Sequence, residues 1–151
     1  MFKTLKDFDV VWKRVLVRCD FDVPMDVKGN ILDDYRIKQS VPTIEYLLEN
    51  KAKVILMGHA GRPDGNVVES LRLNPIQKNL EKHLGIKIVK ANDCVGQQVA
   101  DLSNNLKEGE ILTIKDLLAA TLLESSNDAA YALAEYVGSK YAVMVNSGSS
   151  A

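Results

Sequence analysis

The fold is decided by residues 13–24, which read KRVLVRCDFDVP. The first half of this stretch is a run of mostly apolar, β-branched side chains with little polar alternation, which is typical of a strand buried on both faces. A second run of this kind, KVILM at residues 53–57, ends in Gly58 and His59. The pattern therefore predicts parallel strands whose following loops carry the polar chemistry.

Strands and helices alternate along the rest of the chain. Three more apolar runs predict strands near residues 86–90, 110–114 and 141–146, in addition to 14–19 and 53–57. Alternation of this kind is typical of a parallel sheet that is covered on both faces. We expect an α/β fold in which residues 1–151 form one domain: a three-layer, Rossmann-like open sheet of about five parallel strands with helices on both faces.

Helical patterns fill the segments between the predicted strands. Apolar residues at helical spacing follow Arg36, and Asn74, Pro75 and Gly85 have the types expected of an N-cap, a first helical residue and a C-terminal stop. A further helix is expected from about residue 93. Two shorter helices are then expected, the first capped at Thr113 and the second beginning after a break at residues 125–128.

The composition excludes several classes of function. Nineteen Lys and Arg against 20 Asp and Glu give a net charge of −1, and no basic run occurs, which argues against a nucleic-acid partner or a polybasic membrane anchor. No apolar stretch approaches the roughly 20 residues of a membrane-spanning helix. The two cysteines lack metal-ligand spacing and are too few for a disulfide scaffold, so we expect a soluble, cytoplasmic protein with both thiols reduced.

Five polar residues lie where a ligand would bind. Asp20 and Asp22 follow the first strand, His59 and Arg62 follow the second, and Arg36 opens the helix between them. Ligands of open parallel sheets bind outside the carboxyl ends of the strands, and the planar fork of arginine suits phosphate or carboxylate. These residues indicate either a site for a phosphorylated anion or arginines that merely pair with nearby aspartates.

Several ordered motifs over about residues 11–112 resemble phosphoglycerate kinase. They read KRVLVRCDFDVP, DDYRI, PTIEYLL, AKVILMGHAGRP, ESLR and ANDCVG. The resemblance implies the N-terminal, substrate-binding domain of that kinase. It also implies that 3-phosphoglycerate would be held by the residues at Asp20, Asp22, Arg36, His59 and Arg62.

The chain departs from the family at several of these positions. The family has asparagine where Asp22 stands, and the additional carboxylate is expected to repel an anionic substrate. Gly58 replaces a serine and Ala60 a leucine. After residue 112 the family continues with Glu-Asn-x-Arg, whereas this chain reads TIKD. That arginine is therefore missing, as is the arginine of the family's Gly-Thr-Ala-His-Arg motif.

The sequence after residue 112 resembles two other families. Residues 112–138 are similar to serine D-Ala-D-Ala carboxypeptidases around a Ser-x-Asn motif at Ser125 and Asn127, although the Ser-x-x-Lys and Lys-Thr-Gly that this chemistry requires are absent. The alternative role of this motif is to cap a helix. Residues 140–151 resemble the start of the cofactor-binding region in pyridoxal-phosphate sugar aminotransferases, but no Schiff-base lysine is identifiable, and we expect no cofactor.

The three resemblances are to unrelated families, and their segments join near residues 112 and 139. They predict a chimera. An engineered assembly is favoured over a natural fusion or a mis-assigned sequence. The chain has no Gly-x-x-x-x-Gly-Lys loop or other nucleotide cradle. We therefore expect at most weak binding of a small phosphorylated carboxylic acid and no phosphoryl transfer by this chain alone. The alternatives are a structural scaffold without a ligand, or a kinase fragment that needs a nucleotide domain. The oligomeric state is not predicted.

Overall fold

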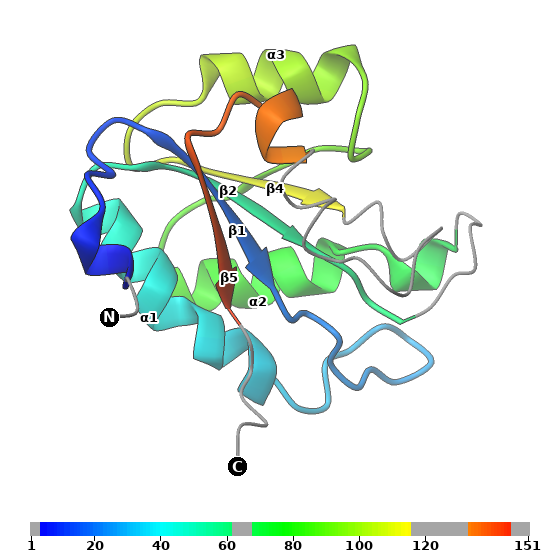
Figure 1. Ribbon diagram of the computed structural model, residues 1–151. Helices are drawn as coiled ribbons and strands as arrows, with labels where there is room; N and C mark the ends of the chain where they lie inside the picture. The colour runs from blue at the N-terminus through cyan, green and yellow to red at the C-terminus, as the bar shows by residue number, and fades with distance from the viewer. Residues whose placement is uncertain (1–3, 62–67, 116–132, 146–151) are drawn as a thin grey trace.

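The computed structural model describes residues 4–61, 68–115 and 133–145 (Figure 1). Three of the features expected from the sequence lie outside these residues. They are Arg62, the helix break at residues 125–128, and the Ser-x-Asn motif that falls within that break.

The described residues form one sheet of five parallel strands, as predicted. The strands are β1 (Arg14–Cys19), β2 (Lys53–Gly58), β3 (Val89–Lys90), β4 (Ile111–Lys115) and β5 (Tyr141–Val145). Their order is β3-β4-β2-β1-β5. β1 pairs with β2 from Arg14 opposite Lys53 onward, and with β5 from Val15 opposite Tyr141 onward.

β3 is shorter than the strand predicted at residues 86–90. The Ile88 amide donates a hydrogen bond to the Glu81 carboxylate at 2.9 Å, and the Ile88 carbonyl accepts one from the Gln77 side chain at 2.8 Å. The backbone at residue 88 is thus bound to a helix, which leaves only Val89 and Lys90 to pair with β4.

Within residues 4–61 and 68–115, three α-helices connect the strands: α1 (Tyr35–Glu49), α2 (Asn74–Leu84) and α3 (Gln97–Asn105). Two 3₁₀ turns add η1 (Leu5–Asp7) and η2 (Glu69–Leu71). α2 ends at Gly85 in a left-handed conformation with φ of 68°, as predicted, but Asn74 lies inside the helix and no side chain caps it. α3 begins at Gln97 rather than near residue 93. Thr113 lies fully buried within β4, so its predicted role as a helix cap is wrong.

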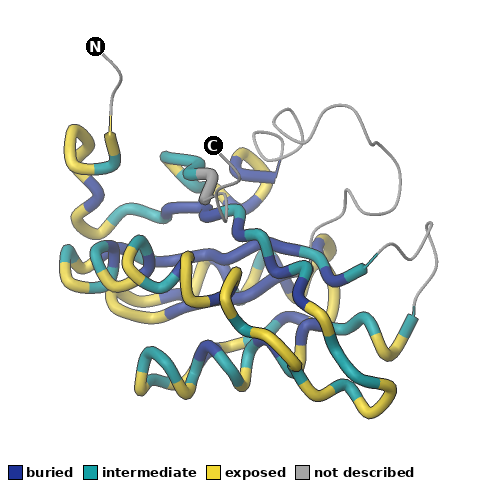
Figure 2. Tube along the Cα trace, turned by 90° about the horizontal axis from the view of Figure 1, so that it is seen from below, coloured by how far each residue is buried: buried dark blue, intermediate teal, exposed yellow. Residues whose placement is uncertain are grey.

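The helices cover both faces of the sheet (Figure 1). Alternate residues of each strand point to opposite faces. One face of β1 packs against α1 and α2 through Val15, Val17 and Cys19. The other face packs through Leu16 against α3 and the helical residues 133–136. Figure 2 shows the buried strands lying between these partly exposed layers. Among the described residues, none of the helices combines the length and apolarity needed to cross a membrane.

Residues 133–145 are bound to the rest of the domain by specific contacts. The buried Ser103 hydroxyl of α3 donates to the Val137 carbonyl at 2.7 Å. The Tyr136 hydroxyl accepts from the Gly96 amide at 2.9 Å and donates to the Gly96 carbonyl at 3.2 Å. The last described segment therefore completes both the sheet and the layer above it.

Ser103→Ala is expected to lower the free energy of unfolding by about 1–2 kcal/mol, because the Val137 carbonyl loses its buried donor. Urea denaturation followed by circular dichroism measures this change. Ser70→Ala removes an exposed hydroxyl and serves as the matched control. Equal stability of the two variants would contradict the role given to the Ser103 contact.

An ion-pair cluster links α1 to α2. The Asp34 carboxylate accepts hydrogen bonds from Lys38 and from His83 Nε2, each at 2.8 Å. The hydrogen bonds from Lys38 and then from His83 hold the pKa of Asp34 well below its usual range. A carboxyl group whose pKa falls on folding stabilises the folded state above its unfolded-state pKa, and this contribution disappears as the pH falls.

The stability lost in Asp34→Asn is therefore expected to be largest near neutral pH and to shrink steadily once the pH falls below about 4. Urea denaturation of both proteins between neutral and strongly acidic pH measures the difference. A difference that does not change with pH would show that charge plays no part in this cluster.

Candidate functional site

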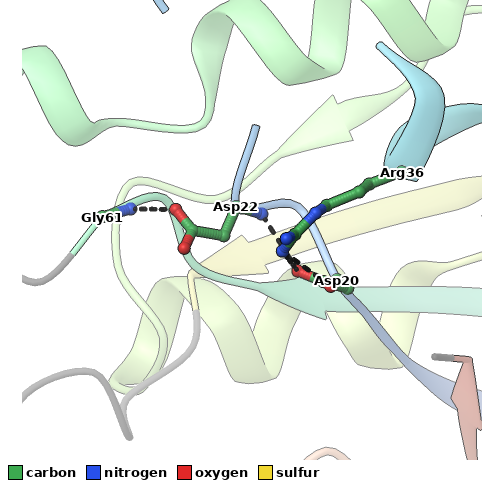
Figure 3. Close-up of polar contacts among 4 residues, drawn as sticks. All are labelled: Asp20, Asp22, Arg36 and Gly61. Carbon is green, nitrogen blue, oxygen red and sulfur yellow. Dashed lines mark hydrogen bonds and ion pairs between the residues drawn. The ribbon is translucent and has the colours of Figure 1, made fainter. Parts of the chain in front are cut away.

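Two loops and one helix start meet at the carboxyl edge of the sheet (Figure 3). β1 ends at Cys19 and continues into Asp20 and Asp22, β2 ends at Gly58, and α1 brings Arg36 into its first turn. Four of the five predicted site residues lie in the described part of the chain. Arg62 does not, so its position beside the others stays a prediction.

Arg36 is bound on one side only. Its Nη1 donates to both oxygens of Asp20, at 3.2 and 3.0 Å, and one of these oxygens also accepts the Asp22 amide at 3.3 Å. The Arg36 side chain is 47% exposed. Its Nη2 and Nε have no partner within the described ranges. The contact with Asp20 orients the guanidinium and leaves donors for an incoming anion.

The other nearby aspartates bind different groups. Asp33 accepts the Tyr35 amide at 2.8 Å, and Asp34 binds Lys38 and His83. Among the described residues, Asp20 is thus the aspartate that pairs with Arg36, and it does not occupy all of the arginine's donors.

Asp22 links the two loops. Its Oδ1 accepts the Gly61 amide at 2.9 Å across 39 positions of sequence (Figure 3). The side chain of the preceding residue, Phe21, is fully buried, and a Cβ at Gly58 would lie 2.4 Å from its ring. Glycine at position 58 therefore allows the ring to pack against the end of β2. His59, half-buried, follows directly.

Arg18 is a charged residue near the site that the motif search missed. It is half-buried, one residue before the end of β1. Its side chain leaves the face opposite to that of Cys19, because side chains alternate along a strand. The signal in the sequence is a charge inside an otherwise apolar run.

The cysteines are structural. Neither forms a disulfide and both are buried, and burial raises the pKa of Cys19 to about 12, which keeps its thiol protonated. In the part of the chain that the structure describes, no group of three or more His, Cys, Asp or Glu residues is arranged to hold a metal ion.

An oriented arginine, a histidine and paired loops at the carboxyl edge of a parallel sheet define an α/β domain with a candidate anion site. The family model of phosphoglycerate kinase matches residues 5–150, and the chain belongs to this family.

Curated relatives and solved structures agree with this assignment. Phosphoglycerate kinase of Moorella thermoacetica is 51% identical over 114 residues, which cover 76% of this chain and 29% of that protein. The enzyme of Aquifex aeolicus is 49% identical over 115 residues, again 76% and 29%. The structure from Coxiella burnetii superposes with a TM-score of 0.77 at 28% identity, over 95% of this chain and 35% of that one. The chain thus spans about 29% of the length of these curated relatives.

Asp22→Ala is expected to speed hydrogen exchange at the Gly61 amide, because the amide loses its only described acceptor. Asp22→Asn retains an acceptor oxygen in the same place and is expected to preserve the protection. Exchange measured by NMR on both variants and on the unaltered chain tests the link. Unchanged protection in Asp22→Ala would contradict it.

Proposed function

We propose that these 151 residues bind a small phosphorylated carboxylic acid, 3-phosphoglycerate in the first instance, and transfer no phosphoryl group by themselves. In this proposal Arg36, His59 and Arg62 contact the acid, Asp20 orients Arg36, and Asp22 weakens binding through its charge. A cytoplasmic location is part of the proposal, because two free, buried cysteines suit a reducing compartment.

The observation that carries the proposal is the one-sided pairing of Arg36. A guanidinium presents five donors in a planar fork, and Asp20 uses only Nη1. Roughly half of the side chain remains exposed, so Nε and Nη2 can donate to a phosphate or carboxylate. Family membership supports the choice of 3-phosphoglycerate.

The absence of turnover follows from the requirements of phosphoryl transfer. The reaction needs a bound nucleotide and metal ions that neutralise the developing charge. The sequence contains no Gly-x-x-x-x-Gly-Lys loop. A kinase fragment that becomes active with a nucleotide domain is the second candidate, favoured by the 29% share of the relatives that this chain covers. A scaffold without a ligand is the third.

We also propose that the chain is a chimera assembled by engineering, with residues 113–151 taken from other families. The sequence motifs after residue 112 support this origin, as does the limit of 105–115 matched residues in the curated relatives. The family-model match that extends to residue 150 favours the simpler alternative of a divergent natural tail.

Amplifying and sequencing the gene across codons 105–145 from the source genomic DNA tests the origin. The proposal expects no natural gene with this uninterrupted reading frame. An intact chromosomal gene would overturn the engineered origin, whatever the chain binds.

Binding of 3-phosphoglycerate is expected to be millimolar or weaker. Each charge-assisted hydrogen bond contributes roughly 1.5–3 kcal/mol, so the two missing family arginines cost about 3–6 kcal/mol, or roughly a hundred- to ten-thousand-fold in affinity. Asp22→Asn is expected to tighten binding about two- to tenfold, because it removes a like charge and keeps the acceptor for Gly61. Calorimetry or chemical-shift titration measures both values.

Arg36→Gln is the matched loss-of-function variant and is expected to abolish measurable binding. Added salt is expected to weaken binding in the unaltered chain. Micromolar affinity would show that the retained cluster is stronger than proposed, and no binding in either the unaltered chain or Asp22→Asn would favour the scaffold. Tighter binding by the unaltered chain than by Asp22→Asn would overturn the charge argument.

A further inference from the structure

A groove of about 530 Å³ lies between the turn that precedes α1 and one side of α2. Lys28 and Asn30 line it from the turn, and Asn74, Lys78 and Lys82 line it from α2. We call it the lysine groove. None of its lining residues belongs to the acid site built around Arg36.

The lysines of the lysine groove form no ion pair in the described part of the chain. No carboxylate is among its lining residues. No ion pair joins Lys28, Lys78 or Lys82 to any carboxylate within residues 4–61, 68–115 and 133–145. The pKa of Glu81 is lowered first by the hydrogen bond from the Ile88 backbone and least by the charge of Lys78. The three ammonium groups are left to water or to a ligand.

The turn that forms one wall of the lysine groove is held by hydrogen bonds of its own. The Asp26 carboxylate accepts the amides of Lys28 and Asn30, each at 2.8 Å, and the Asn30 side chain at 2.8 Å. Met25 and Ile31 close the turn as an antiparallel bridge. These contacts hold the backbone that carries Lys28. The Asp26 carboxylate binds groups of the turn itself and forms no ion pair with Lys28.

α2 adds two further features. Lys78 and Lys82 lie one helical turn apart, where like charges repel each other unless an anion lies between or over them. The start of the helix has no capping side chain and no acidic residue in its first turn. The positive end of the helix thus reinforces the field of the lysines in the same groove.

The geometry points to a linked chain of phosphate groups as the ligand, and we propose that the lysine groove binds one. Lysine is a compact point charge that suits phosphate oxygens, whereas planar carboxylates are best matched by the fork of arginine, and no arginine lines the groove. The three lysines line one groove from two elements, and two of them lie on successive turns of α2, so a ligand with several connected phosphates suits them better than a single phosphate does.

Titration of the full chain with inorganic tripolyphosphate, followed by ¹H–¹⁵N chemical shifts at low salt, tests the proposal. The expected result is saturable shifts at the amides of residues 28–31, 78 and 82. The double variant Lys78→Gln, Lys82→Gln is expected to bind roughly a hundredfold more weakly, because each lost charge-assisted contact costs about tenfold. Citrate, which carries three carboxylates, is expected to bind much more weakly than tripolyphosphate.

The control double variant Lys6→Gln, Lys107→Gln makes the same change in charge at exposed lysines outside the groove, and it is expected to bind as the unaltered chain does. Arg36→Gln is expected to leave the tripolyphosphate-induced shifts at residues 28–31, 78 and 82 unchanged, which separates this site from the proposed acid site. No saturable binding, equal loss in both double variants, equal affinity for citrate, or shifts confined to the loops of Asp20 and His59 would each overturn the proposal.

Discussion

The parallel pairing of β1 with both β2 and β5 is the constraint on which the rest of the structure depends. Val15, Leu16 and Val17 are fully buried, so the centre of this strand is shielded from water on both faces. Both layers of helices must therefore be in place before its burial is complete. The same pairing brings the carboxyl ends of β1 and β2 to one edge of the sheet, where each strand continues into a polar loop.

At this edge of the sheet, Asp20 and Asp22 each bind one partner on another segment. Asp20 binds Nη1 of Arg36 and leaves Nε and Nη2, and Asp22 accepts the Gly61 amide of the neighbouring loop with one oxygen. In the proposed function the remaining donors bind an anion, and the charge of Asp22 opposes it. Away from this edge, the lysine groove shows the reverse balance, with cations that no described carboxylate pairs.

Periodicity predicted the strands and their two faces because burial on both sides leaves a strong mark in the sequence, as in residues 14–19 and 53–57. It predicted β3 poorly, because the hydrogen bonds of Glu81 and Gln77 to residue 88 are tertiary contacts. Thr113 was predicted to be a cap because Asp116 follows it at the spacing of a capping box, which is a local signal. Its burial in β4 depends instead on the neighbouring strands.

In the candidate site, too, local sequence signals could be predicted and tertiary contacts could not. The pairing of Asp20 with Arg36 followed from loop positions that parallel strands impose. The contact between Asp22 and Gly61 could not be predicted, because an amide donor has no sequence signature. The lysine groove was missed for a similar reason: its charges come from two separate elements, and no stretch of sequence shows them together.

The position of β5 beside β1 has a consequence for synthesis on the ribosome. β1 is among the first elements to leave the ribosome, and its neighbour on one side is the last described strand. Val15 therefore cannot pair with Tyr141 until about 125 more residues have been synthesised. Until then the nascent sheet presents an unpaired apolar edge, of the kind that holdase chaperones protect and that promotes aggregation in long-range topologies. Slower translation of the residues between β1 and β5 therefore lengthens the time during which this edge is open to aggregation.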